Sequence, residues 1–168
     1  MDIGLISGQT ISIKTKYATF VVDESTASSK TEADAAIFLK EGGDIKTQAR
    51  VVIDGPGDYE IGGVKITATA AGKGLSYLIK SGNLDVLLAN VATLTSMKDK
   101  IPQVKVVILN VDSDMDPALI SEADPRVLVV YGEGAPLEKI AQGKEKIKKI
   151  SIKQDKLPTD TMETVVLG

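Results

Sequence analysis

Three acidic residues at alternating positions are the first candidates for a chemical site. Asp112, Asp114 and Asp116 have the spacing with which the start of an EF-hand loop surrounds calcium with oxygen ligands. The pattern then breaks, because Pro117 stands where that loop needs glycine and Ala123 occupies the position of its last acidic ligand. We predict that Asp116 instead caps a helix starting at Pro117; weak binding of calcium or magnesium is the alternative.

The chain contains no histidine and no cysteine among its 168 residues. This excludes Ser-His-Asp and Cys-His nucleophile pairs, Cys/His zinc sites, Fe–S clusters and disulfides. A catalytic base would have to be Asp, Glu, Lys or Tyr, and a metal would have to be a hard cation on oxygen ligands. The sequence has no signal-peptide pattern and no apolar run of about 18 residues, so we expect a cytoplasmic protein that does not bind membranes.

The overall charge gives no reason to expect nucleic acid as a partner, since 20 Lys and Arg residues face 23 Asp and Glu residues. Lysines do gather toward the C-terminal end, at Lys139, Lys144, Lys146, Lys148, Lys149, Lys153 and Lys156. No aromatic residues that could stack on bases are interleaved with them, and Ile147, Ile150 and Ile152 supply an apolar face. We predict a solvated strand edge whose lysines oppose aggregation.

The elements that must position these residues are mostly short strands with an aliphatic core, because 43% of the chain is hydrophobic and only 4% aromatic. Apolar runs predict strands over residues 3–6, 11–13, 17–22, 35–39, 51–53, 59–61, 64–67, 75–79, 86–89, 104–111, 126–131, 147–152 and 164–167. The runs at 35–39 and 51–53 are predicted to be buried, and the polar residues 24–33 to form an exposed loop. Short helices are predicted over 95–101, 117–122 and 136–142. No long linker interrupts residues 1–168, so we expect a single strand-rich α/β domain.

One segment resembles a known family. Residues 52–64 have the sequence VIDGPGDYEIGGV, which is similar to a stretch in bacterial hydrolases of the metallo-β-lactamase fold superfamily, in the group of ascorbate-6-phosphate-lactonase-like proteins. There the stretch forms strand, glycine turn, strand, tight turn and strand, the order that the apolar pattern predicts here. The order of the remaining elements also fits. The resemblance implies a four-layer αββα sandwich of two mixed β-sheets with short outer helices.

The resemblance also aligns the family's metal motif, His-x-His-x-Asp-His, with the residues after the strand at 35–39. Its aspartate falls on Asp44, whereas its three histidines are replaced by Lys40, Gly42 and Ile45. The helix that follows this motif in the family looks shortened or lost here. Asp44 alone cannot hold zinc, which needs several converging imidazole and carboxylate ligands.

Two further positions of the family's site are also changed. The metal-bridging aspartate is replaced by Asn90, a neutral and weak ligand, and the last histidine falls at Tyr131. The resemblance therefore implies the fold and argues against its usual activity: a degenerate member with no metal and no cofactor. A simpler interpretation of Asp44 and Asn90 is that they are caps or loop residues after strands.

Two functions from different classes follow. The first is a non-catalytic, metal-free binding, regulatory or scaffold domain that pairs with itself or with an active relative. The second is a phosphodiesterase or lactonase that uses a carboxylate-only or non-zinc site in the same cleft, formed by Asp44, Glu41, Lys40 and Asp54.

Overall fold

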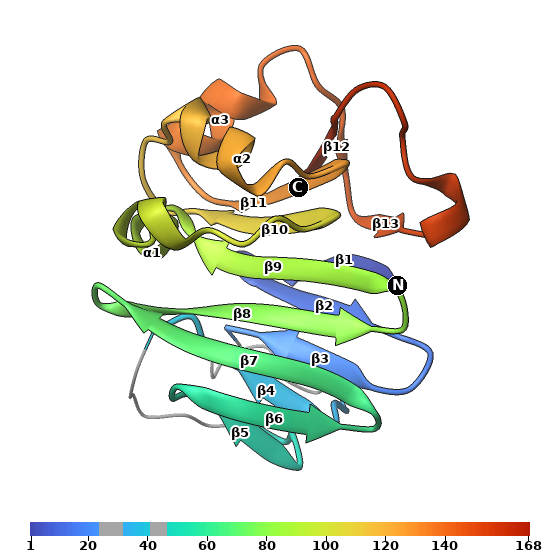
Figure 1. Cartoon of the computed structure of the whole chain (residues 1–168). Helices are drawn as coiled ribbons and strands as arrows, with labels where there is room; N and C mark the ends of the chain where they lie inside the picture. Colours follow the sequence, from blue (N-terminus) through green and yellow to red (C-terminus); the bar gives the residue numbers. More distant parts are fainter. Residues whose placement is uncertain (24–31, 41–46) are drawn as a thin grey trace.

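Two β-sheets face each other across one core in the computed structural model, which describes residues 1–23, 32–40 and 47–168 (Figure 1). The first sheet has the strand order β13-β1-β2-β3-β4-β5. Strands β13, β1, β2 and β3 pair antiparallel, and β3, β4 and β5 pair parallel. Its strands are β1 (Asp2–Ser7), β2 (Thr10–Lys14), β3 (Thr19–Val22), β4 (Ala35–Ile37), β5 (Val51–Ile53) and β13 (Lys149–Ser151).

The second sheet has the order β12-β14-β11-β10-β9-β8-β7-β6. An antiparallel meander, β6 to β9, continues into parallel strands from β9 to β12. Its strands are β6 (Gly57–Ile61), β7 (Val64–Ala71), β8 (Gly74–Ser81), β9 (Leu84–Asn90), β10 (Val106–Val111), β11 (Val127–Gly132), β12 (Lys146–Ile147) and β14 (Glu163–Leu167). The predicted sandwich of two mixed sheets is confirmed.

Three short α-helices cover the outer face of the second sheet: α1 (Val91–Ser96), α2 (Pro117–Ala123) and α3 (Ala135–Ala141) (Figure 1). Two 3₁₀ turns, Lys98–Lys100 and Gln154–Lys156, complete the described helical structure. No α-helix of the described residues covers the outer face of the first sheet, where Val21, Ala33 and Ala36 form a small apolar cluster. None of the described helices is long and apolar enough to cross a membrane.

The parallel strands of the second sheet are buried on both faces, as expected for strands between a helix layer and a second sheet. In β10, Val106 and Ile108 face the first sheet, whereas Val107 and Leu109 face the helices. Because side chains alternate along a strand, the next residue on the core-facing side is Asn110. The alternation that builds the core thus also places the last residues of these strands between the sheets.

The segment that carries the resemblance folds as predicted, into β5, a glycine turn, β6, a tight turn and β7. Gly62 and Gly63 occupy the tight turn with φ angles of 58° and 80°. Positive φ at both central residues is what a type I′ hairpin turn requires. A Cβ atom at Gly62 would also lie 2.7 Å from the Tyr17 carbonyl oxygen. Glycine is therefore needed there for conformation and for space.

Several predicted boundaries were wrong. The helix predicted at 95–101 is α1, four residues earlier, because the side chain of Asn90 caps it at its start. The strand predicted at 147–152 divides at Lys148: β12 pairs with β14 in the second sheet and β13 with β1 in the first. The run at 51–53 is only partly buried, because β5 lies at a sheet edge; Val51 is 37% exposed and Val52 39%. Most of the loop predicted at 24–33 lies outside the described residues.

Candidate functional site

Three polar side chains lie next to one another where three parallel strands end. Asn110 on β10 is in register with Asn90 on β9 and with Tyr131 on β11. All three are buried, with exposed fractions of 3%, 5% and 0%. Each continues the core-facing row of its strand, so all three point into the space between the sheets. We call this end of the sandwich the rim, and it also includes Asp23 at the end of β3.

Asp23 holds the first sheet together at the rim. Its N–H donates to the Ile37 carbonyl (2.9 Å), its Oδ1 accepts from the Leu39 N–H (2.8 Å), and its carbonyl accepts from the Thr10 hydroxyl (2.8 Å). Its φ of 49° lies in the left-handed region, which few residues other than glycine, asparagine and aspartate adopt. Asp23 therefore connects the ends of β2, β3 and β4.

Burial raises the pKa of the Asp23 carboxyl from 3.8 to about 6, although the Leu39 N–H and the Lys40 charge act in the opposite direction. The carboxyl therefore changes its charge near neutral pH, where an ordinary aspartate is fully ionised. Perturbed carboxyls of this kind gather at functional sites, so Asp23 is a candidate for binding or proton transfer.

The Tyr131 hydroxyl and the Asn110 amide nitrogen are buried, and neither has a hydrogen-bond partner among the described residues. Burial first, and then the charge of Asp23, raises the pKa of Tyr131 well above its usual value. The Asn110 side chain opposes this rise, although the two groups do not meet the geometry of a hydrogen bond. The rim therefore offers a neutral phenol and an amide as donors. Unpaired buried donors cost about 1–3 kcal/mol each, which a water or ligand acceptor would offset.

The structure gives Asn90 a structural role. Its Oδ1 accepts the Thr93 N–H at 2.7 Å and so caps α1, as the simpler interpretation predicted.

Lys40 is exposed and forms an isolated antiparallel bridge with Gly74 on β8, beside a hydrogen bond from the Leu75 N–H to the Leu39 carbonyl (2.9 Å). This contact joins the two sheets next to the rim.

The remaining positions of the predicted site are not all described. Gly42, Asp44 and Ile45 lie outside the described residues, as does Glu41. Asp54 is half-buried in the turn between β5 and β6. Of the predicted residues, the structure therefore places Asn90 and Tyr131 in one row, on either side of Asn110, and Lys40 near Asp23.

The described rim residues do not fit a dinuclear zinc centre. Zinc takes imidazole, thiolate and carboxylate ligands, and the chain has no histidine or cysteine. The oxygen of Asn90 already accepts a backbone N–H, Tyr131 is kept neutral, and Asp23 is a single carboxyl. No group of three acidic residues that could hold a metal occurs within residues 1–23, 32–40 and 47–168.

The three alternating aspartates serve separate purposes. Asp116 accepts the Ala118 N–H at 2.9 Å and caps α2, with proline at the first turn, which confirms that prediction. Asp114 pairs with Lys139 on α3 at 2.7 Å, and Asp112 accepts the Ala92 N–H at 3.3 Å. Their carboxylates contact three different elements.

The lysine-rich segment forms edge strands. Strand β12 forms one edge of the second sheet, and strand β13 forms one edge of the first sheet. Lys146 pairs with Glu138 at 2.6 Å and Lys149 with Asp2 at 2.9 Å, in exposed or partly exposed positions. Exposed ion pairs contribute little to the stability of the fold. We therefore expect these charged residues mainly to keep the sheet edges solvated.

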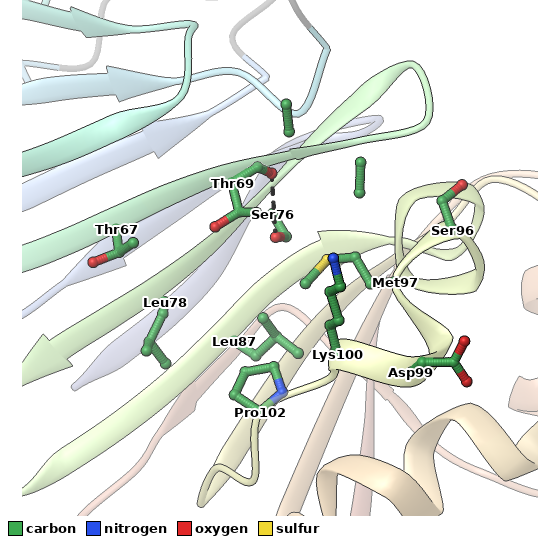
Figure 2. A pocket seen from close by; sticks show the side chains of 12 residues that line it. Thr67, Thr69, Ser76, Leu78, Leu87, Ser96, Met97, Asp99, Lys100 and Pro102 are labelled. Carbon is green, nitrogen blue, oxygen red and sulfur yellow. Dashed lines mark hydrogen bonds between the residues drawn. The ribbon is translucent and has the colours of Figure 1, made fainter.

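A separate hollow of about 430 Å³ lies on the outer face of the second sheet, beside the segment after α1 (Figure 2). Leu78 and Leu87 come from the strands, and Met97 and Lys100 come from the segment that follows the helix. None of the rim residues lines it. This lining is mixed in polarity and shows no convergence of charged groups.

Solved structures reproduce this architecture over the whole chain. A proposed Zn-dependent hydrolase of the metallo-β-lactamase superfamily from Thermotoga maritima matches 99% of this chain and 98% of its own, with a TM-score of 0.75 and 18% identity. The chain has the metallo-β-lactamase fold. A proposed metal-dependent hydrolase from Parabacteroides distasonis (98% of this chain, 91% of its own, TM-score 0.63, 13% identity) and the metallo-β-lactamase fold protein YhfI from Bacillus subtilis (99%, 96%, 0.56, 11%) are also similar. No family model matches the sequence, and no curated protein does.

Sequence reasoning missed two rim residues, Asp23 and Asn110. Each follows or ends an apolar strand, as Asn90 and Tyr131 do, and this shared position is the signal that could have found them. The resemblance directed attention only to the family's metal positions. The row of Asn90, Asn110 and Tyr131 depends on strand register, which the apolar pattern does not specify.

Proposed function

We propose that this chain is a metal-free, non-catalytic protein with the metallo-β-lactamase fold, acting as a binding, regulatory or scaffold domain. The observation that carries the proposal is the row of Asn90, Asn110 and Tyr131 at the rim. Two amides and a neutral phenol occupy strand ends there, and one of the amides is already used as a helix cap. Such groups donate hydrogen bonds to a ligand, and they do not activate water as a zinc ion does.

The chemistry of the rim favours a ligand that accepts hydrogen bonds. The Tyr131 hydroxyl and the Asn110 amide nitrogen supply donors, and Asp23 supplies another when it is protonated. The partners that we propose for the domain are a second copy of the chain or an active relative of the same fold, and neither nucleic acid nor a membrane.

One observation favours the alternative, a hydrolase of the phosphodiesterase or lactonase type that works without zinc. A carboxyl with a pKa of about 6 beside a neutral phenol is suited to general acid–base catalysis at neutral pH. Lys40 and Asp54, which the sequence also nominates for this activity, are among the described residues, and Lys40 lies close enough to lower the pKa of Asp23.

Turnover assays separate the two functions. The chain is incubated with a chromogenic phosphodiester and with a lactone, without metal and with added Zn²⁺, Mn²⁺ or Mg²⁺. We expect rates equal to those of buffer with the same metal. Turnover that Asp23→Asn abolishes and the exposed control Asp99→Asn leaves intact would establish the hydrolase and refute the non-catalytic function.

A further inference from the structure

Among the described strands, four form the edges of the two sheets, and on each of three of these edges all charged residues have the same sign. Strands β12 and β13 carry Lys146 and Lys149, and β6 carries Asp58 and Glu60. Like charges on an edge oppose its pairing with a second copy of the same edge. Strand β5 differs, because it consists of Val51, Val52 and Ile53 and contains no charged residue.

The central residue of β5 forms no backbone hydrogen bond to another described strand on the side away from β4. The Val51 N–H donates to the Asp34 carbonyl (3.2 Å), and the Ile53 carbonyl accepts from the Phe38 N–H (3.0 Å), so residues 51 and 53 bond toward β4. Because successive residues of a strand direct their N–H and C=O groups to opposite sides, those of Val52 face away from β4, toward the sheet edge that no described strand covers. Its side chain is also 39% exposed.

Opposite charges flank this central residue at equal distances. Arg50 precedes Val52 by two residues and Asp54 follows it by two. Neither side chain forms a salt bridge with any described residue. In an antiparallel pair centred on Val52, Val52 would meet the partner's Val52, and Arg50 would lie opposite the partner's Asp54. Arg50 and Asp54 directly flank β5. In a pairing that extends β5 by one residue at each end, positions two apart share a face, so both ion pairs and the valine pair would lie on the same side of the sheet.

We propose that two copies of this chain associate through β5, pairing antiparallel about a two-fold axis at Val52 so that their first sheets become one continuous sheet. The hydrogen-bond direction and the charge symmetry independently select the same register. A contact between three-residue strands is small, so the dimer is expected to be reversible and to depend on concentration. The proposal specifies the self-association within the proposed function and does not depend on whether the chain binds metal.

Sedimentation velocity over a range of protein concentrations, with circular dichroism to verify folding, tests the interface. We expect a monomer–dimer equilibrium in the wild type and monomers for Val52→Lys, which places two lysines opposite each other. Arg50→Asp and Asp54→Arg should each weaken dimerisation about tenfold, because both attractive pairs become repulsive. The double reversal Arg50→Asp/Asp54→Arg should restore dimerisation. The control Thr67→Lys, on the exposed face of β7, should leave the monomer–dimer equilibrium unchanged.

A wild type that stays monomeric at the highest concentration overturns the proposal. So does a dimer that persists in both Val52→Lys and Arg50→Asp, or a double reversal that fails to recover dimerisation while folded. The charge-reversal series needs no core substitution, so it remains informative if Val52→Lys does not fold. A dimer that carries metal would refute the proposed metal-free function and support this interface. A metal-free monomer would refute this interface and leave the metal-free function standing.

Discussion

Replacement of Asp23 by asparagine should stabilise the protein at neutral pH and not at acidic pH. The pKa of the Asp23 carboxyl rises from 3.8 to about 6 on folding, mainly through burial. The folded state therefore binds this proton more tightly than the unfolded state does. Its contribution to stability is complete below pH 3.8 and is lost as the pH rises to about 6. A difference of about two pKa units corresponds to about 3 kcal/mol.

Asparagine keeps the Oδ1 acceptor for the Leu39 N–H and tolerates the left-handed backbone at this position. Because asparagine does not titrate, Asp23→Asn should exceed the wild type in the free energy of unfolding by up to about 3 kcal/mol above pH 7, and by only about 0.5 kcal/mol near pH 4. Urea denaturation at the two pH values measures this difference, and the exposed Asp99→Asn controls for the loss of a charge. An effect of equal size at both pH values would refute the argument.

Three further substitutions test the local structure by equilibrium unfolding. Tyr77→Phe should lower the free energy of unfolding by about 1–3 kcal/mol, because the Tyr77 hydroxyl donates to the Phe38 carbonyl (2.5 Å). Tyr131→Phe should be neutral or stabilising, because the Tyr131 hydroxyl has no described partner. Equal losses in the two variants would contradict this contrast. Gly74→Ala should cost at least about 1–3 kcal/mol, since its Cβ would lie 2.1 Å from the Thr93 Oγ1; a variant as stable as the wild type would show that β8 can shift. Asn90→Ala should cost about 1 kcal/mol through loss of the α1 cap, and Asn90→Asp should retain most of it; equal losses in the two variants would argue against the cap.

The sequence predicts the sandwich well, because alternating and continuous apolar runs define strands whichever way those strands pair. It predicts α2 equally well, since Asp116 and Pro117 form a local start signal. The start of α1 was missed because Asn90 ends a strand and caps a helix at once. The division of the predicted strand at Lys148 depends on which sheet each half joins, and no local pattern contains that information.

The candidate site was predicted only in part, for the same reason. The family resemblance placed Asn90 and Tyr131 at strand ends, and the structure puts both of them at the rim. Asn110 and Asp23 reach the rim through long-range contacts: strand register for the first, and the apposition of two sheets for the second. The raised pKa of Asp23 arises from burial, which becomes visible only when the packed sheets are known.

The metal content of the purified full chain tests the central claim most directly. The protein is expressed in medium supplemented with zinc, iron and manganese, purified without chelator, and analysed by inductively coupled plasma mass spectrometry. The donor set of the rim predicts far less than one metal ion per chain after dialysis. Retention of zinc, iron or manganese near one ion per chain, with micromolar or tighter affinity, would contradict the proposal that this fold here works without its metal.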